Sequence, residues 1–348
     1  MSELSIDLEF MLDFLVRLLN TPSPTGFSDA AINLVEEALK GFTNLEFSRT
    51  RKGGLLARWQ GSSDAHPRAL TAHVDTLGAM VKEIKPNGRL KLTKLGGYAW
   101  NTVEGEGVRV YTMAGKTIRG SILLAKSSSH VHGAATNDTK RDDDSMEVRL
   151  DEKTTSAMET RELGVEVGDF VAFDPRVEIN NGFVRSRHLD DKACVANIVA
   201  ALKAIQDAGL QPAQTTYLYF SNYEEVGHGA AAGIPQEVEE LLAVDMAAIG
   251  EGQNSNEFNV SICVKDSGGP YHHGFSTRLR ELAARQGIDL KVDIYPFYGS
   301  DGSAFWRAGG DVRVALIGPG VDASHNYERT HTQALLDTTR LIIAYLLS

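Results

Sequence analysis

Strand-like and helix-like segments alternate along most of this chain, but the stretch from Thr76 to Arg176 breaks the pattern. Apolar residues recur at helical spacing in 8–19 and 192–208, with strand-like runs before and after them. Between Thr76 and Arg176, short strand-like pieces are separated by glycines and charged turns. Alternation predicts an α/β sheet, whereas the interrupting stretch is typical of a small β-barrel or sandwich. We therefore expect one α/β domain, formed by residues 1–75 and 177–348, with a β-rich domain of residues 76–176 inserted into it.

Size and charge exclude several classes of protein. The 348 residues exceed the roughly 100–200 residues of a usual domain, and the net charge of -11 opposes binding to nucleic-acid phosphates. No apolar run reaches the ~18 residues that cross a bilayer, and the acidic start of the chain is unlike a signal peptide. Cys194 and Cys263 lie in apolar runs and predict two buried free thiols in a reducing compartment. We expect a cytoplasmic protein with no nucleic-acid or membrane partner.

Glu224 and Glu225 follow a run, 215–220, that is typical of a buried strand. Adjacent side chains on a strand point to opposite faces, so the two carboxylates should have different tasks. One can bind a metal while the other moves a proton, as a metal-dependent hydrolase requires. An isolated Glu-Glu pair is more often a solvated acidic turn, and only the other residues of the chain can decide between the two interpretations.

Other polar residues stand at or after the ends of strand-like runs, although each has a structural explanation of its own. Since active sites of open α/β sheets lie beyond the carboxyl ends of the strands, we expect these residues to lie together. Two histidines and three carboxylates suit two divalent ions of the zinc, cobalt or manganese type, with one carboxylate bridging them. The candidates are His73, Asp190, Glu224, Glu225, Asp245 and His325, with Asp75 as an acid that could orient His73.

Three further features are interpreted as structural. The segment 127–132 contains two histidines and is more readily a loop that reaches toward a neighbour or the active site than a metal site. The charge run 137–144 predicts a mobile, exposed loop. His228, which follows the Glu-Glu-Val-Gly segment, is interpreted as part of the loop and not as a ligand.

The ordered set of short segments resembles peptidase family M42, the dinuclear TET or glutamyl aminopeptidases. Members of that family are also called deblocking aminopeptidases and sometimes endoglucanases. The resemblance covers nearly the whole chain, including the inserted stretch. The matching segments are Ala72-His73-Val74-Asp75 with Gly78, Leu189-Asp190-Asp191-Lys192, Tyr223-Glu224-Glu225-Val226-Gly227 with Gly229-Ala230, Val244-Asp245, Gly299-Ser300-Asp301-Gly302 and His325.

The resemblance implies a phosphorylase/hydrolase-like, three-layer αβα catalytic domain with an inserted PDZ-like dimerisation domain. Such chains build homo-oligomers, typically dodecameric tetrahedral shells, and remove N-terminal residues from short peptides. The resemblance also implies two divalent ions per subunit, with zinc preferred over cobalt or manganese. Asp190 would bridge the ions, with His73 and Asp245 completing one site and Glu225 and His325 the other.

The resemblance further assigns roles to residues around the ions. Glu224 would be the general base that deprotonates the bridging water, and Asp75 would orient His73. Ser300 and Asp301, with Tyr298, would line the pocket that selects the substrate.

The chain departs from the family pattern in two places. The usual Asp-Asp-Arg or Asp-Asn-Arg is Asp190-Asp191-Lys192 here, which should spare the metal ligand. The usual His-Ser-Pro is replaced around His325, and His331 is a second candidate ligand. We prefer His325, because it precedes the expected helix N-cap Thr332 by seven residues.

Three alternative functions stay open. The first is a related deacylase or carboxypeptidase-type amidohydrolase on the same scaffold, and the second is a catalytically inactive, shell-forming homologue. A glycosidase is least favoured. Adjacent glutamates on opposite faces of a strand fit poorly with two carboxyls that flank one sugar bond roughly 5–10 Å apart.

Overall fold

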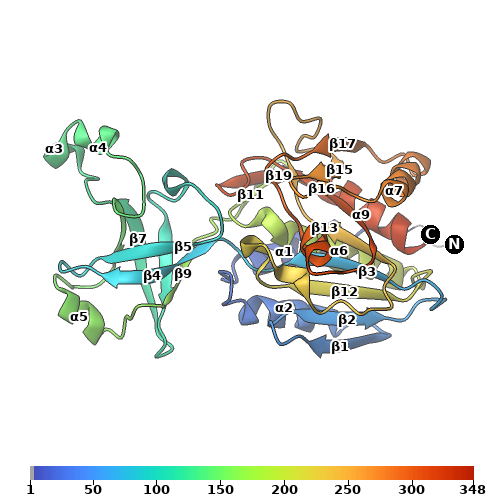
Figure 1. Cartoon of the computed structure of the whole chain (residues 1–348), viewed down its shortest axis with the longest axis horizontal. Coiled ribbons are helices and arrows are strands. Elements are labelled where there is room, and N and C mark those ends of the chain that lie inside the picture. The colour runs from blue at the N-terminus through green and yellow to red at the C-terminus, as the bar shows by residue number, and fades with distance from the viewer. Residues whose placement is uncertain (1–3) are drawn as a thin grey trace.

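The structure, a computed structural model, describes residues 4–348 and has two parts (Figure 1). The larger part is built on a sheet with the strand order β1-β2-β12-β3-β13-β18-β15-β16, in which β17 also pairs with β15. Its strands are β1 (Leu45–Arg49), β2 (Leu55–Trp59), β3 (Arg68–His73), β12 (Thr216–Ser221), β13 (Glu240–Val244), β15 (Val260–Asp266), β16 (Gly269–Pro270), β17 (Leu290–Ile294) and β18 (Arg313–Val321), with β14 (Ala247–Ala248) beside β18.

The central strands β12, β3, β13 and β18 run parallel to one another. Because helices or turns cover both faces, every residue of β3, β12 and β13 is buried, and apolar residues fill the middle of β12 and β13. One face carries α1 (Leu8–Leu19), α2 (Asp29–Leu39), α6 (Leu189–Asp207), α7 (His273–Arg285) and α9 (Thr332–Leu346). The other face carries α8 (Asp301–Arg307) and the 3-10 turns η2 (Glu224–Val226) and η3 (Gly229–Ala231). The α/β fold class predicted from the sequence is thus confirmed.

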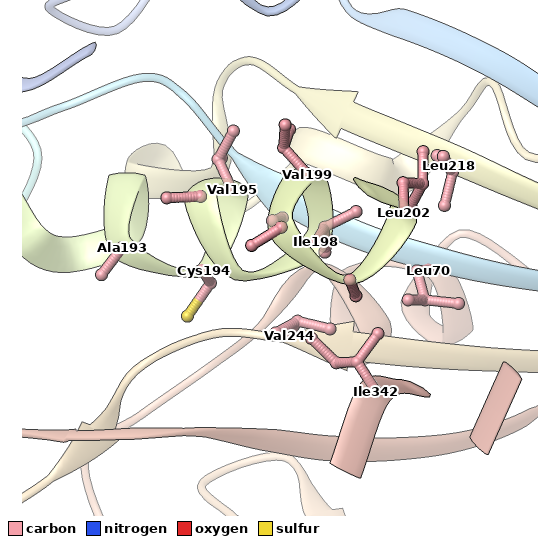
Figure 2. Packing of buried hydrophobic residues seen from close by; sticks show 14 of the residues in the cluster. Leu70, Ala193, Cys194, Val195, Ile198, Val199, Leu202, Leu218, Val244 and Ile342 are labelled. Carbon is pink, nitrogen blue, oxygen red and sulfur yellow. The ribbon is translucent and has the colours of Figure 1, made fainter. Parts of the chain in front are cut away.

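Helix α6 is the centre of the main hydrophobic core. It packs against both α1 and α9, and its alanine-rich sequence lets these neighbours approach closely. Figure 2 shows part of this core, where Ile198 and Leu202 of α6 lie among Leu70 of β3, Val244 of β13 and Ile342 of α9. The helix is buried along almost its whole length, so its first residues are held in a fixed place.

The smaller part is a closed barrel with the strand order β4-β5-β8-β7-β6-β9, which confirms the expected β-barrel-like insertion. It has its own apolar core, and α3 and α4 lie on the side of the barrel away from the larger part in Figure 1. Its elements are β4 (Gly78–Ile84), β5 (Leu90–Leu95), η1 (Trp100–Thr102), β6 (Gly107–Tyr111), β7 (Thr117–Leu124), α3 (Ser129–His132), α4 (Ala135–Asp138), β8 (Met146–Leu150), α5 (Ala157–Glu162) and β9 (Phe170–Phe173).

Two loop interpretations can be compared with the structure. Residues 129–132 of the segment 127–132 form the short exposed helix α3, on the side of the barrel away from the large sheet, so the segment does not reach toward the active site expected in this chain (Figure 1). Its contact with a neighbouring molecule stays a prediction. The charge run 137–144 is tied to other segments at three points, one of which is the ion pair between Lys91 and Asp144. Arg141 Nε donates to Glu104 at 2.8 Å, and Trp100 donates to Asp143. Both segments were interpreted from local composition, which does not report such distant partners.

The structure also bears on what the sequence indicates about the cysteines and about membrane-spanning segments. Cys194 and Cys263 are free and buried, as predicted. Within residues 4–348, no helix combines the length and apolar character that a membrane crossing would require.

Where β18 passes Asp245, the two backbones are so close that only glycine fits. A Cβ at Gly318 would overlap the carbonyl oxygen of Asp245. We expect Gly318→Ala to lower the free energy of unfolding by about 1–3 kcal/mol, the usual cost of overpacking, in a urea titration followed by circular dichroism. Gly250→Ala is the control, since its Cβ would meet nothing within 4 Å. Equal stability of the two variants would contradict this packing.

Candidate metal centre

Parallel strands bring the first candidate residues together at one edge of the sheet. The register of β3 and β12 sets His73 beside Ser221, so the turn that carries Glu224 and Glu225 starts next to His73. Strand β13 lies on the other side of β3, and Asp245 follows its last residue, Val244. These residues meet because the carboxyl ends of parallel strands lie at the same edge.

Asp190 lies between two histidines. Its Oδ1 is 3.2 Å from His73 Nε2, and its Oδ2 is 3.3 Å from His325 Nε2. His73, Asp190 and Asp245 form one group, and Asp190, Glu225 and His325 form another, in which the potential ligand atoms all lie within 4.8 Å of one another. Nitrogen and carboxylate donors in this number suit zinc, cobalt or manganese. The residues therefore fit two divalent ions that share Asp190.

Glu225 belongs to the second group and Glu224 to neither, and the two glutamates face different histidines although they do not alternate on a strand. Strand β12 ends at Ser221, Tyr223 adopts a left-handed conformation with φ 74°, and the two glutamates form the 3-10 turn η2. From this turn, Glu224 Oε2 reaches 3.6 Å from His73 Nε2, and Glu225 Oε2 reaches 3.5 Å from His325 Nε2. Different surroundings for the two glutamates were expected, but the strand geometry used to predict them was wrong, and their separate roles stay a prediction.

Asp75 holds both the histidine and the glutamate turn. The Nδ1 of His73 lies 2.9 Å from the backbone oxygen of Asp75 and 3.7 Å from its carboxylate. That carboxylate accepts hydrogen bonds from the backbone N–H of Glu224 at 3.1 Å and of Glu225 at 3.3 Å, and from Thr25 Oγ1 at 2.7 Å. Asp75 is thus the shared support of the His73 ring and of η2.

Glu328 was missed by sequence reasoning. Its buried carboxylate accepts hydrogen bonds from the backbone N–H of Asp190 at 3.1 Å and of His325 at 3.0 Å, so it fixes residues of both groups. Glu328 is the one acid between His325 and the last helix, a signal that could have singled it out. No spacing rule, however, links it to Asp190.

The barrel also contributes to the centre. His325 Nδ1 contacts the backbone oxygen of Gly97, which belongs to the inserted stretch. A ring that donates through Nδ1 turns Nε2 toward the acids, and this nitrogen could bind a metal once it has lost its proton. Arg187 fastens the same junction, since it donates to Glu106 at 2.9 Å, to the backbone of Thr102 and to the backbone of Asn326 at 3.2 Å.

His331 and His228 lie outside the two groups. His331 is the N-cap of α9, a place expected for Thr332, and its Nδ1 accepts the backbone N–H of Gln333 at 3.1 Å. It also packs against Phe183 with ring centroids 4.9 Å apart. His228 stacks on Tyr223 at 5.2 Å, consistent with a structural role.

Ser300 and Asp301 are almost fully buried and occupied by structural contacts. Ser300 caps α8 through a reciprocal pair of hydrogen bonds with Ser303. The Asp301 carboxylate accepts from Thr71 Oγ1 at 3.0 Å, from the backbone N–H of Ala230 at 2.6 Å and from Ser221. Their side chains therefore support the cavity from behind, and residues just before them form its wall.

That cavity has a volume of about 460 Å³ and opens beside the two groups. Asp190, Glu224, Glu225, Asp245 and His325 line one side of it, and the remaining wall is formed by Gly227, Met246, Ala248, Gln253, Tyr295, Pro296, Phe297, Tyr298, Gly299, Arg307 and Ser324. A cavity of this size beside a metal centre is a suitable place for a small substrate.

Burial and mutual repulsion perturb the acids of this cavity. Burial, with the charge of Asp190, raises the pKa of Glu225 to about 8 and that of Asp245 to about 7. Burial also raises the pKa of Glu224 well above its usual range. For Asp190, burial acts in the same direction, but hydrogen bonds from His325 and His73 outweigh it and lower the pKa. The acids resist joint ionisation, and bound cations would relieve this.

The fold and the paired groups suit a metal-dependent hydrolase, and similarity to known proteins shows the family. Residues 53–341 match the M42 glutamyl aminopeptidase family. The Bacillus subtilis (strain 168) protein YhfE is 48% identical over 338 residues, which cover 97% of each chain. The chain therefore belongs to the M42 glutamyl aminopeptidase family and is a peptidase, so the resemblance found in the sequence is confirmed.

Two solved structures share the fold. A TET aminopeptidase from a marine-sediment Thaumarchaeota archaeon aligns with a TM-score of 0.87 at 19% identity, over 97% of this chain and 96% of the other. The TET1 peptidase of Pyrococcus horikoshii, which can assemble into a tetrahedron or a large octahedral shell, aligns with a TM-score of 0.84 at 22% identity, over 97% and 99%.

The perturbed acids predict how pH affects the metal-free protein. Glu225 and Asp245 keep protons in the native state to about pH 8 and 7, whereas the unfolded chain releases them near pH 4 to 5. The native state thus binds more protons over this interval, and its stability falls as pH rises. His325, whose pKa is raised to about 10 because hydrogen bonding to Asp190 outweighs burial, acts in the same direction above pH 6.5.

Calorimetry from pH 5.5 to 8.5 should therefore show the melting temperature of the chelator-treated protein falling with pH. Metal requires deprotonated ligands, so the increase in melting temperature on adding zinc or manganese should grow with pH. A metal-induced increase in melting temperature that is the same at every pH would contradict the prediction that these acids are protonated in the metal-free protein.

Glu328 provides a second prediction. In Glu328→Gln only one side-chain oxygen remains, so the backbone N–H of Asp190 or of His325 loses its acceptor. We expect metal affinity to fall about 10- to 100-fold, as for other groups that support metal ligands, in a competitive titration with a chromogenic chelator. Glu281→Gln on the exposed face of α7 is the matched control, and equal affinities of the two variants would contradict the assignment.

Proposed function

We propose that this protein is a dinuclear metal-dependent aminopeptidase that removes N-terminal residues from short peptides. The observation that carries the proposal is the position of Asp190, whose two oxygens face His73 and His325 at 3.2 and 3.3 Å. A single carboxylate shared in this way is the arrangement needed to bridge two ions. Membership in the M42 glutamyl aminopeptidase family supports the same conclusion.

The proposed ligand set assigns two protein groups to each ion beyond the shared Asp190. His73 and Asp245 would complete one site, and Glu225 and His325 the other. We propose zinc as the native metal. Cobalt and manganese are the alternatives, because neutral imidazole and carboxylate donors suit all three ions. When bound, such ions supply a polarised scissile carbonyl and a water of lowered pKa.

Glu224 is the proposed general base. Its carboxylate lies in the cavity, 3.6 Å from His73 Nε2, and nothing in either group requires it as a ligand. Burial raises its pKa, which suits a carboxylate that must accept a proton from water and pass it to the leaving amine near neutral pH. Asp75 fixes its backbone through the Glu224 N–H, and so holds the base in place.

The proposed restriction to the N-terminal residue follows from the charge of the cavity. A free amino group is a cation, and the acids beside the two histidines can hold it next to the scissile bond. A blocked N-terminus lacks that charge. This is how the proposal differs from a deacylase or carboxypeptidase-type activity on the same scaffold.

We also propose that the barrel, with domain boundaries near residues 76 and 176, serves oligomerisation. The TET1 peptidase of Pyrococcus horikoshii, which forms tetrahedral or octahedral shells, has the same fold over nearly its full length. On the barrel of this chain, Met113, Met158 and Val167 are exposed apolar side chains, which suits a surface that contacts another subunit. A dodecameric shell in the cytoplasm is the assembly and location we propose.

Replacing the proposed base tests the mechanism. Purified Glu224→Gln, loaded with zinc, cobalt or manganese, should release amino acids from short peptides with a kcat lowered about 10²- to 10⁴-fold, the usual contribution of a general base. Its metal content, measured by mass spectrometry, should match that of the unmodified protein. Glu281→Gln is the surface control.

Two results would contradict the proposal. Full activity in Glu224→Gln would remove Glu224 from the mechanism. Hydrolysis of N-acetylated peptides as fast as of the same peptides with a free amino group would favour the amidohydrolase alternative.

A further inference from the structure

Gln253 lies on the wall of the cavity and has a side-chain oxygen without a partner. It belongs to the loop between β14 and β15, and it lines the same cavity as the four carboxylates of the candidate metal centre. Its Oε1 is buried and has no hydrogen-bond partner among residues 4–348. Buried polar atoms are nearly always hydrogen-bonded, so this oxygen requires an explanation. None of the roles proposed above uses it.

The wall has one other polar side-chain atom that is buried without a partner, the hydroxyl of Tyr295. The side chains of Ser255 and Ser261 lie beside that hydroxyl, which can donate to either of them. An amide oxygen can only accept, so Gln253 needs a donor that the described residues do not supply. A buried acceptor without a donor costs about 1–3 kcal/mol. A ligand that brings an N–H group into the cavity would recover part of this free energy.

The backbone of the loop holds Gln253 in a defined place. Directly after it, the N–H groups of Asn254 and Ser255 donate to the carboxylate of Asp293 on β17 at 2.7 and 2.9 Å. The N–H of Gln253 itself donates to the backbone oxygen of Gly250 at 3.1 Å. The amide can still turn about the last side-chain bond, because that torsion has broad minima. The oxygen can therefore move to meet a group that is bound in the cavity.

The proposed mechanism leaves one part of a peptide substrate without a partner. The amino group is assigned to the acids of the cavity, and the scissile carbonyl to the metal ions. The scissile nitrogen must stay free to leave with a proton from Glu224. The first main-chain N–H that no proposed contact uses is thus that of the peptide bond between the second and third residues. A glutamine amide suits that N–H, because its oxygen is a neutral acceptor with two lone pairs.

We propose that Gln253 accepts a hydrogen bond from the peptide N–H that follows the second residue of the substrate. The enzyme then favours peptides of three or more residues over dipeptides, which lack this group. The inference rests on the proposed aminopeptidase function and adds to it a residue that selects substrates by length.

One pair of substrates differs in this group alone. In Leu-Gly-Gly the second peptide bond carries an N–H, whereas in the depsipeptide Leu-Gly-glycolate an ester oxygen replaces it. Release of leucine from both, and from the dipeptide Leu-Gly, is measured with the metal-loaded full chain. The same measurements are made with Gln253→Met, which has a similar size and no amide, and with Gln236→Met, the same change at an exposed position.

The unmodified enzyme and Gln236→Met should have a higher kcat/KM for Leu-Gly-Gly than for the depsipeptide, through KM more than through kcat. The ratio should be about 2- to 10-fold, the value of one neutral hydrogen bond. In Gln253→Met this ratio should disappear, while the hydrolysis of Leu-Gly should change little. The melting temperature of the metal-free Gln253→Met should not fall, because the oxygen that it lacks has no partner in the protein.

Equal kcat/KM values for the two substrates in the unmodified enzyme, or a ratio that Gln253→Met leaves unchanged, overturn the inference. An equal loss on all three substrates with a lower melting temperature does so too, because it indicates a structural role for the glutamine. Failure of the proposed function would look different, since none of the three proteins would release leucine from any substrate.

Discussion

The rest of the structure depends on one electrostatic constraint, the burial of several carboxylates in a single cavity. Asp190, Glu224, Glu225 and Asp245 lie close enough together that burial and mutual repulsion raise the pKa of three of them, while two histidines lower that of Asp190. Removing charges from water costs several kcal/mol per ion unless opposite charges compensate. The side-by-side placement of these acids is therefore consistent with the proposed pair of metal ions, which would supply the opposite charge.

Few of the contacts that enforce this arrangement are made by the candidate ligands themselves. Asp75 holds η2 through two backbone N–H groups, Glu328 joins the backbones of Asp190 and His325, and Asp301 anchors α8 against the sheet. Each is a buried carboxylate that accepts hydrogen bonds from other segments of the chain. The buried acids at this cavity thus have two tasks, to face the proposed metal ions or to hold the segments that carry the candidate ligands.

The sequence predicted the parts of the site that follow from parallel strands. His73 and Asp245 end neighbouring strands, and the rule that such ends meet at one edge was enough to place them together. It did not predict η2, because the left-handed conformation of Tyr223 depends on tertiary contacts and the strand pattern gives no sign of it. It also assigned Ser300 and Asp301 to the substrate, although a Gly-Ser-Asp-Gly segment at a helix start serves equally well as a cap. Glu328 and Gly97 were missed because their partners are distant in sequence.

The contact between Gly97 and His325 joins residues 228 positions apart in the sequence. It bears on how the protein is made. Synthesis proceeds from the N-terminus, so the barrel, β3, α6 and η2 leave the ribosome well before the segment that supplies the last histidine. Until that segment docks between Arg187 and Gly97, a nascent chain has the acids but not the second imidazole. The proposed metal centre is thus completed only after translation has passed His325 and Glu328.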